Sequence, residues 1–351
     1  MFNKFFGLFS HDIGMDLGTA TTLVYVSGKG IVINQPSVVA FNQKTNQIVA
    51  IGNEAKEMVG RTPSHIVAVR PLKEGVISDF EMTQEMISYF VKKVHKETVR
   101  PFVRPRMVIG IPSGITGVEK KAVRDAARNA GAREVFLVEE PVAAAIGVKL
   151  PIQEPIGNMV VDIGGGSTDI VVISLGGIVV SKNLRIAGDQ MNQDIINYAR
   201  EEFKLLLGER TAEDIKIAVG SALPSRDDIE TIVRGRDLIT GLPREAIITD
   251  ADVREALSGS LNTLAESVRG VIEQTPPELL SDIMHRGIIL VGGGAFLRGL
   301  PEFLESEAKI PVHLADDPFT AVVRGTGIIL ENLDSLREVL SEDDDEIPPQ
   351  Y

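Results

Sequence analysis

The sequence predicts an α/β protein built from two similar domains, and repeated glycine-rich turns are the main reason. Residues 159–174, MVVDIGGGSTDIVVIS, contain two runs rich in Val and Ile around three consecutive glycines, a pattern typical of two strands joined by a turn. Residues 13–33 repeat this plan half a chain earlier, with matching residues at three positions: Asp16 and Asp162, Gly18 and Gly164, Thr22 and Thr168. A third turn of this kind occurs in IILVGGGAFL at 288–297. Such internal repetition indicates a duplicated domain.

Length and composition agree with two globular domains. A chain of 351 residues is long for one hydrophobic core, and its 44% hydrophobic and 24% charged residues are ordinary for a globular protein. The sequence has no cysteine, which excludes disulfides and thiol-based metal or redox sites. The net charge of −13 argues against non-specific binding of nucleic acid. No apolar run is long enough to span a bilayer.

The glycine-rich turns suit a phosphate. Glycine lets backbone N–H groups approach an anion without a Cβ in the way. Asp162, at the end of a predicted strand, suits a hydrated Mg²⁺, which prefers oxygen ligands and keeps several waters, and Asp16 is its match in the first repeat. One such turn is easily explained as a β-turn without a ligand, but three turns of the same kind are not. We therefore expect two like domains that face one nucleotide.

Residues 1–10, MFNKFFGLFS, are predicted to form a short amphipathic helix. At about 100° per residue, one side is apolar and carries Met1, Phe2, Phe5, Phe6, Leu8 and Phe9. Aromatic residues beside a lysine are typical of helices that lie in the membrane interface. The alternative is a segment packed on the protein's own surface or on a neighbouring subunit.

Periodicity and turn residues predict the elements of the first half. Short strands at 37–41 and 47–51 and a helix at 54–60 form a small insertion. Buried strands are expected at 107–111 and 135–138, and helices with one apolar face at 83–94 and 118–130. The loop PFVRP at 101–105 exposes Phe102 and Val103 to a membrane or a partner, although packing on its own domain fits better.

Glu140 stands where a helix through Ile146 is expected to begin. Pro141 favours a helix start, and a carboxylate there suits the helix dipole, so Glu140 has a structural explanation. Equally, a carboxylate that projects from a strand end can orient a water toward a phosphate. Position alone does not separate these two roles.

The second half contains further candidate contacts. Gly188 and Asp189 at a helix start are placed to meet a ribose. Thr211 and Asp214 resemble a capping box of the next helix. On that helix Glu213 and Lys216 share a face, the spacing of an ordinary surface ion pair.

The remaining elements complete the second domain and return to the first. Residues 231–239 and 246–249 are expected strands of a second insertion, and 250–274 a long helix that ends before Pro276-Pro277. Residues 321–330 are expected to form a final helix. The tail SEDDDE at 341–346 is predicted to be a solvated end.

Several common sites are excluded. The sequence has no G-x-x-x-x-G-K-[ST] phosphate loop, no G-x-G-x-x-G after a strand and no G-x-S-x-G elbow. The five histidines show no metal-ligand spacing.

The motifs carry a resemblance to a known group of proteins. D-x-G-T at Asp16–Thr19, D-x-G-G-G at Asp162–Gly166 and G-G-G at Gly292–Gly294 resemble the nucleotide motifs of the actin/Hsp70/sugar-kinase superfamily. Four segments resemble its MreB family of bacterial actins, the rod-shape-determining proteins: DLGTATTLVYV, VFLVEEPVAAAIG, GERTAEDIK and ADDPFTAVVRGTG. The likeness runs from about Met1 to Leu330. It implies an actin-like ATPase fold of RNase H-like duplication, in which each domain has a mixed five-stranded sheet flanked by helices and the nucleotide lies in a cleft between them.

The resemblance also implies domain boundaries. Domain I would comprise residues 1–145 and 318–351, with a small insertion at 34–75. Domain II would comprise residues 146–317, with an insertion at 184–248. Residues 1–10 would be the membrane helix and 341–351 an acidic tail.

The resemblance assigns the site residues as follows. ATP would be bound by Asp16, Gly18, Thr19, Ala20 and Thr21 of the first loop, by Asp162, Gly164, Gly165, Gly166 and Ser167 of the second, and by Asp189, Glu213, Lys216, Gly292, Gly293, Gly294, Ala295 and Phe296. Glu213 and Lys216 thereby become adenosine contacts. Glu140, which positions the hydrolytic water, and Ser167 would be catalytic. Asp16 and Asp162 would hold Mg²⁺ through water, and Phe2, Phe5, Phe6, Leu8 and Phe9 would contact the membrane.

The family pattern further implies the biology. It implies a slow ATPase that polymerises into filaments of paired protofilaments, located in the cytoplasm at the inner face of the cell membrane. The expected partners are further copies of the chain and membrane proteins of the cell-wall elongation machinery, with no nucleic acid. Three residues depart from the pattern: Ser167, Asp169 and Asn192 stand where Thr, Glu and Asp are common.

Two other function classes fit the same fold. A sugar-kinase-type phosphotransferase needs a catalytic Asp base and a substrate pocket, whereas this sequence offers Glu140-Pro141. A chaperone ATPase needs a peptide-binding domain, and the sequence offers none after about residue 340.

Overall fold

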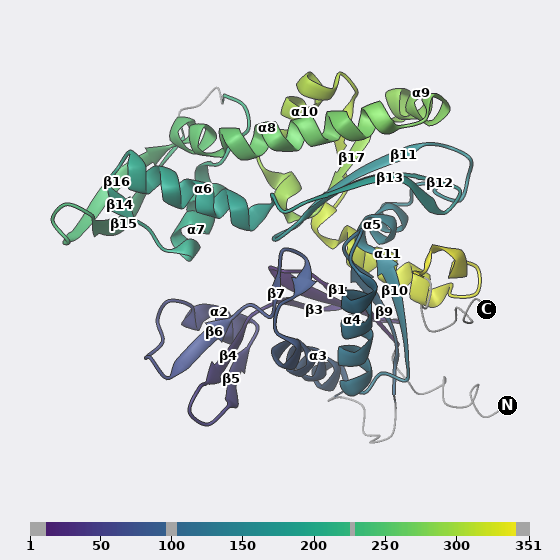
Figure 1. The fold of residues 1–351 in the computed structure, drawn as a ribbon, viewed down its shortest axis with the longest axis horizontal. Helices are drawn as coiled ribbons and strands as arrows, with labels where there is room; N and C mark the ends of the chain where they lie inside the picture. The colour runs from purple at the N-terminus through teal and green to yellow at the C-terminus, as the bar shows by residue number, and fades with distance from the viewer. Residues whose placement is uncertain (1–11, 96–103, 225–228, 342–351) are drawn as a thin grey trace. The chain divides into compact units, whose positions relative to one another are not determined.

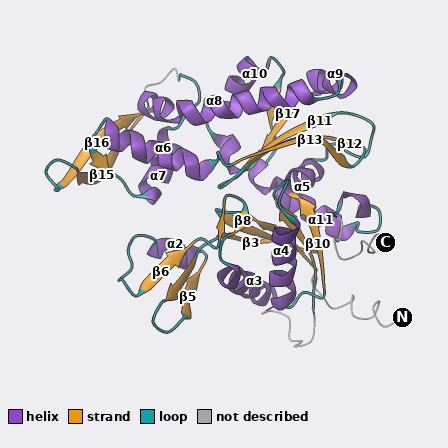
Figure 2. Cartoon of the chain, viewed as in Figure 1, coloured by secondary structure: helices purple, strands orange, loops and turns teal. Residues whose placement is uncertain are grey.

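The computed structural model describes residues 12–95, 104–224 and 229–341, and these divide into two units. Unit 1 comprises residues 1–155, 173–178 and 319–351, and unit 2 comprises residues 156–172 and 179–318. Figure 1 labels the elements, and Figure 2 separates helices from strands. The predicted membrane helix at 1–10, the loop residues Phe102 and Val103, and the acidic tail beyond Ser341 lie outside the described residues.

Unit 1 is built on a mixed five-stranded sheet with the order β10-β9-β1-β2-β3. Its strands are β1 (Ile13–Leu17), β2 (Thr21–Val26), β3 (Gly30–Pro36), β9 (Arg106–Ile111) and β10 (Glu134–Glu139). The pairs β1–β2 and β2–β3 are antiparallel, whereas β1–β9 and β9–β10 are parallel. Because parallel neighbours need a crossover, α4 (Gly117–Asn129) connects β9 to β10.

Helices cover both faces of this sheet. On one face α3 (Phe80–His95) and α4 share a core with Ile13 and Met15 of β1. On the other face lie α5 (Glu140–Gly147) and α11 (Ala321–Glu331), where a Cβ at Gly14 would lie 2.6 Å from Thr326 Oγ1. Since side chains alternate along a strand, Asp16 projects to the same face as Gly14.

A small sheet and a hairpin complete unit 1. β4 (Val39–Asn42), β5 (Gln47–Ile51) and β6 (Ile66–Val69) form a sheet with the order β5-β4-β6, beside α2 (Asn53–Met58). This sheet has its own core of Val38, Ala40, Ala50 and Ala55. β7 (Leu72–Lys73) and β8 (Val76–Ile77) pair as a short hairpin that leads to α3.

Unit 2 repeats the plan of the large sheet, with the order β13-β12-β11-β17-β18. Its strands are β11 (Asn158–Ile163), β12 (Thr168–Ser174), β13 (Gly177–Leu184), β17 (Ile288–Val291) and β18 (Val312–Leu314). β17 runs parallel to both β11 and β18. Every residue of β11 and β12 is buried, which explains why both strands appear in the sequence as nearly continuous apolar runs.

One hydrophobic core joins this sheet to the helices of unit 2. The helices are α6 (Gly188–Glu201), α7 (Glu209–Val219), α8 (Asp250–Gln274), α9 (Pro277–Arg286) and α10 (Leu300–Ala308). A smaller antiparallel sheet contains β14 (Leu205–Leu206), β15 (Glu230–Asp237) and β16 (Pro243–Thr249). In the described part of the chain, no helix combines the length and the hydropathy needed to cross a bilayer.

The expected fold of two mixed five-stranded sheets flanked by helices is confirmed, and α8 has the predicted ends. The capping box expected at Thr211 is wrong. α7 begins at Glu209 after Gly208, so that Thr211 lies inside the helix and not before it. Capping boxes occur instead at Thr116, before α4, and at Thr249, before α8, where each threonine accepts from the backbone N–H three residues on.

Glycines allow α5 and α11 to cross at close range within unit 1. A Cβ at Gly325 would lie 1.7 Å from the carbonyl oxygen of Ala143, and a Cβ at Gly147 would lie 2.0 Å from that of Ala321. Both obstacles are backbone atoms, so a substitution forces the helices apart.

We predict that Gly325→Ala lowers the free energy of unfolding by about 2–3 kcal/mol or more, because overpacking of a helix crossing cannot be relieved by a side-chain rotation. Gly259→Ala in α8 is the matched control, since a Cβ at Gly259 would have no atom within 4 Å. That change should stabilise the protein by about 0.5–1 kcal/mol through helix propensity. Equal unfolding midpoints in urea for the two variants would contradict the prediction.

Candidate functional site

The first predicted phosphate loop lies between β1 and β2 of unit 1 and is fixed by hydrogen bonds from two other segments. Ser37 donates its hydroxyl to the carbonyl oxygen of Gly18 at 2.6 Å and its backbone N–H to that of Ala20 at 3.0 Å. From the β7–β8 turn, the N–H of Gly75 donates to Thr19 Oγ1 at 2.9 Å. Neither Ser37 nor Gly75 was a candidate in the sequence, because no motif marks them.

Asp16 and Glu140 lie near each other on the face of the sheet that carries α11. Asp16 pairs with Gly110 of β9, and a Cβ at Gly110 would lie 3.3 Å from Glu140 Cγ and 3.1 Å from Val322 of α11. Neighbouring strands are about 4.8 Å apart, so the two carboxylates are near neighbours. Glu140 is the first residue of α5, after the N-cap Glu139, as expected.

Burial raises the pKa of the Asp16 carboxyl from 3.8 to about 7. Removal from water disfavours the charged form, since its hydration is lost. A divalent cation held through water would favour the charged form again. The residues of unit 1 therefore fit the predicted role of Asp16 beside a hydrated Mg²⁺.

The second predicted phosphate loop closes the β11–β12 connection in unit 2. The N–H of Gly164 donates to the carbonyl oxygen of Ser167 at 2.9 Å, which closes the turn. The carbonyl oxygens of Gly164 and Gly165 accept from the first N–H groups of α6, those of Gly188 at 3.1 Å and Asp189 at 2.7 Å. The turn is thus attached to the N-terminus of α6.

The third glycine-rich turn packs against the end of β11. A Cβ at Gly292, whose φ is +82°, would lie 2.4 Å from Asp162 Oδ1. The turn continues as a 3₁₀ segment, Gly293–Phe296, in which Ala295 is buried and Phe296 is 55% exposed. An exposed aromatic ring on a rigid turn suits a flat ligand such as a base.

Lys216 of α7 reaches the same region of unit 2. Its Nζ donates to the carbonyl oxygen of Gly188 at 2.7 Å, and a Cβ at Gly188 would lie 3.3 Å from that Nζ. Glu213, one turn earlier on α7, is half-buried. Unit 2 thus brings together Asp162, the second loop, Asp189, Lys216 and the third turn.

The residues that depart from the family pattern are buried. Ser167 is 7% exposed and Asp169 is 2% exposed, and Asp169 accepts from Asn183 Nδ2 at 3.0 Å. Asp169 therefore has a structural partner on β13. Asn192 on α6 is 4% exposed, and its side-chain oxygen has no hydrogen-bond partner among the described residues.

Among the described residues no three acidic or histidine side chains cluster to form a metal site. Mg²⁺ is commonly bound through water and phosphate oxygens with only one or two carboxylates, which is the role expected for Asp16 and Asp162.

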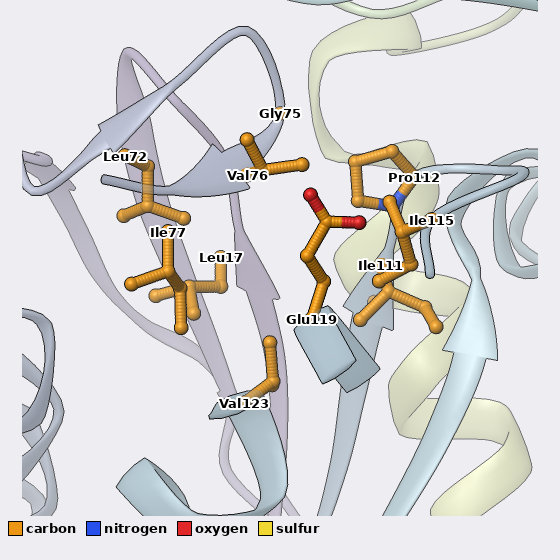
Figure 3. Close-up of a pocket in the computed structure, with 11 residues that line it drawn as sticks. Leu17, Leu72, Gly75, Val76, Ile77, Ile111, Pro112, Ile115, Glu119 and Val123 are labelled. Atoms are coloured by element: carbon orange, nitrogen blue, oxygen red, sulfur yellow. The ribbon is translucent and has the colours of Figure 1, made fainter. Parts of the chain in front are cut away.

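A pocket in unit 1 is lined by the end of β1, the β7–β8 hairpin, the end of β9 and the start of α4 (Figure 3). Its walls are mostly apolar and include Leu17, Leu72, Val76, Ile111 and Pro112. The carboxylate in the lining belongs to Glu119, which accepts from the N–H and the hydroxyl of Thr116 in the α4 capping box. An apolar lining with a carboxylate does not suit a phosphate, so we assign no phosphate to this pocket.

We predict a pH-dependent penalty at Asp16 in the absence of divalent cations. Between about pH 4 and pH 7 the folded protein holds a proton that the unfolded chain has released, so the contribution of Asp16 to stability falls as the pH rises. Asp16→Asn removes the penalty, and its stability relative to wild type should rise across this range in urea titrations with EDTA.

Asp237→Asn is the control for this prediction. Backbone hydrogen bonds from Thr240 and Ile239 lower the pKa of Asp237, so this carboxyl is ionised in both the folded and the unfolded protein above about pH 5. Its stability difference from wild type should stay constant where that of Asp16→Asn grows. Parallel pH profiles for the two variants would refute the assignment.

Comparison with known proteins identifies the family. The sequence profile of the MreB/Mbl protein family matches residues 10–338. The chain is 51% identical over 329 residues to the cell shape-determining protein Mbl of Bacillus cereus, covering 94% of this chain and 98% of that protein. It is 50% identical over 339 residues to the cell shape-determining protein MreB of Escherichia coli, covering 95% and 97%. The crystal structure of MreB5 of Spiroplasma citri bound to AMPPNP matches with a TM-score of 0.88 and 37% identity, covering 94% and 98%. The resemblance found in the sequence is confirmed: this chain has an actin-like fold and belongs to the MreB/Mbl family of cell shape-determining proteins.

Proposed function

We propose that this protein is an ATP-binding, ATP-hydrolysing bacterial actin. On this proposal it polymerises into membrane-associated filaments that organise cell-wall synthesis and maintain the rod shape of the cell. The observation that supports nucleotide binding best is the pair of equivalent turns, one in each unit, each beside a buried or half-buried aspartate. The relative MreB5 binds AMPPNP, an ATP analogue, which agrees with the same ligand here.

The proposed ligand is ATP with Mg²⁺, and ADP after hydrolysis. Thr19, Ala20 and Thr21 of unit 1 and Gly165, Gly166 and Ser167 of unit 2 bind phosphates. Asp189 binds the ribose, Glu213 and Lys216 the adenosine, and the turn Gly293–Phe296 the adenine. Asp16 and Asp162 hold Mg²⁺ through water.

Glu140 is the proposed base that positions the attacking water. It begins α5 at the carboxyl end of β10. Between β10 and β1, the strand that carries Asp16, lies β9 with Gly110, and a Cβ at Gly110 would lie 3.3 Å from Glu140 Cγ. Its carboxylate is half-buried, so it retains access to water. Ser167 keeps the hydroxyl that the family's threonine supplies, so its proposed contact with the phosphate survives.

Membrane attachment is proposed to depend on residues 1–10 and on polymerisation. One short helix gains on the order of 1.5–3 kcal/mol per fully buried aromatic side chain, and less at an interface, against an ordering cost of similar size. A filament presents many such helices, and each later contact becomes effectively intramolecular. The proposed partners are further copies of the chain, the inner face of the cytoplasmic membrane and membrane proteins of the cell-wall elongation machinery.

We predict that Glu140→Ala binds ATP like wild type but releases phosphate about 10²-fold more slowly, because a positioned base is lost while the binding loops remain. Phosphate release under single-turnover conditions measures the effect. Glu139→Ala, which removes the neighbouring carboxylate at the N-cap, should keep the wild-type rate. Normal phosphate release by Glu140→Ala would contradict the assignment of Glu140 as the residue that positions the attacking water.

We predict that replacing Phe5 and Phe6 by Asp leaves ATP-dependent polymers in solution but removes them from liposomes. The control replaces Asn3 and Ser10 by Asp, which adds the same charge on the polar side of the predicted helix. Sedimentation with and without ATP measures polymerisation, and co-flotation measures membrane binding. Co-flotation of the Phe5 and Phe6 variant at the wild-type level would point to another anchor, such as Phe102 and Val103.

A further inference from the structure

Ser37 occupies an unusual position for a residue outside every nucleotide motif. It lies at the junction of β3 and β4, is 0% exposed, and contacts the first phosphate loop through both its side chain and its backbone. Its hydroxyl also lies 2.8 Å from Thr22 Oγ1. A hydroxyl has one proton, and that of Ser37 is given to Gly18, so Thr22 is the donor in the second contact.

These bonds determine which way the peptide groups of the loop point. In a trans peptide the C=O of one residue and the N–H of the next point in opposite directions. Ser37 holds the carbonyl groups of Gly18 and Ala20 on its own side. The N–H groups of Thr19 and Thr21 therefore point to the opposite side, away from Ser37.

The second loop has the same orientation with a different anchor. There the carbonyl groups of Gly164 and Gly165 are held by the N–H groups of Gly188 and Asp189 at the start of α6. The N–H groups of Gly165 and Gly166 accordingly point away from α6. Two turns in one molecule thus use independent anchors to turn two carbonyl dipoles to one side and two N–H groups to the other.

We propose that Ser37 is a positioning residue for phosphate binding, which it promotes by holding the first loop with its carbonyl oxygens away from the ligand. This inference rests on the proposed binding of ATP. A carbonyl oxygen that faced the phosphates would repel them, whereas N–H groups attract them. Without the Ser37 hydroxyl, the Gly18 carbonyl loses its donor and the Gly18–Thr19 peptide is free to rotate.

The test compares ATP with adenosine on Ser37→Ala. ATP affinity should fall about tenfold, the scale of one hydrogen bond, while adenosine affinity stays unchanged because it has no phosphate. Thr326→Val is the matched control: Thr326 is also 0% exposed in unit 1, and its hydroxyl donates to the carbonyl oxygen of Val323, which is not part of the loop. This variant should bind both ligands like wild type.

Ser37→Cys guards against a variant that fails to fold. A thiol is close in size to a hydroxyl but a weaker donor, so ATP affinity should fall a few-fold with no change for adenosine. Wild-type ATP affinity in either folded Ser37 variant would overturn the proposal, as would an equal loss for ATP and adenosine, which indicates general disruption. If wild-type protein itself bound no ATP, the proposed function would fail and this inference with it.

Discussion

A turn that binds an anion must direct its carbonyl groups away from it, and this constraint governs the candidate site. A short loop cannot satisfy the constraint alone, because each exposed carbonyl is an acceptor that needs a donor. Unit 1 supplies the donors from Ser37 at the β3–β4 junction, and unit 2 supplies them from the first turn of α6. In each unit, the donors therefore come from the segment that follows the third strand, which is Ser37 after β3 in unit 1 and α6 after β13 in unit 2.

The parallel strands of unit 1 bring the carboxylates of Asp16 and Glu140 close together, and burial there removes hydration from Asp16. β1, β9 and β10 run parallel, so Asp16, Gly110 and Glu140 meet at one edge of the sheet. Burial at these strand ends disfavours the charged form of Asp16 and raises its pKa to about 7. A cation at this edge would restore the charge and release a proton, which couples metal binding to pH near neutrality.

The sequence predicted what depends on local pattern. Apolar runs in the sequence indicate buried strands, and the predicted site residues stand at the ends of these runs. They are Asp16, Asp162 and the glycines of 164–166 and 292–294. The repeated sequence pattern predicted two similar sheets, because the pattern in one half of the chain indicates the same structure in the other half. The capping box predicted at Thr211 was wrong because a threonine three residues before an aspartate also occurs inside helices. Here the helix begins earlier, at Glu209.

Ser37 shows what local pattern cannot predict. Its partners Gly18 and Ala20 are in the β1–β2 loop, and Thr22 is on β2. Their contact with Ser37 follows from the β2–β3 pairing, in which Thr21 lies opposite Pro36. A one-residue change in that register would turn the Ser37 side chain to the other face of the sheet. The serine was visible in the sequence, but its role depends on a register that only the folded sheet defines.

The two halves of the chain hold their predicted phosphate loops in the same orientation, but they do so with different residues. The second loop begins with three glycines, Gly164 to Gly166, and the peptide groups of Gly164 and Gly165 are held by N–H groups of α6. The first loop carries side chains at Thr19, Ala20 and Thr21, and these restrict its backbone. The Thr19 hydroxyl accepts from Gly75 and is thereby turned toward the β7–β8 hairpin. The first loop therefore requires two external anchors, at Ser37 and Gly75, because its own residues offer the backbone competing partners that glycine does not.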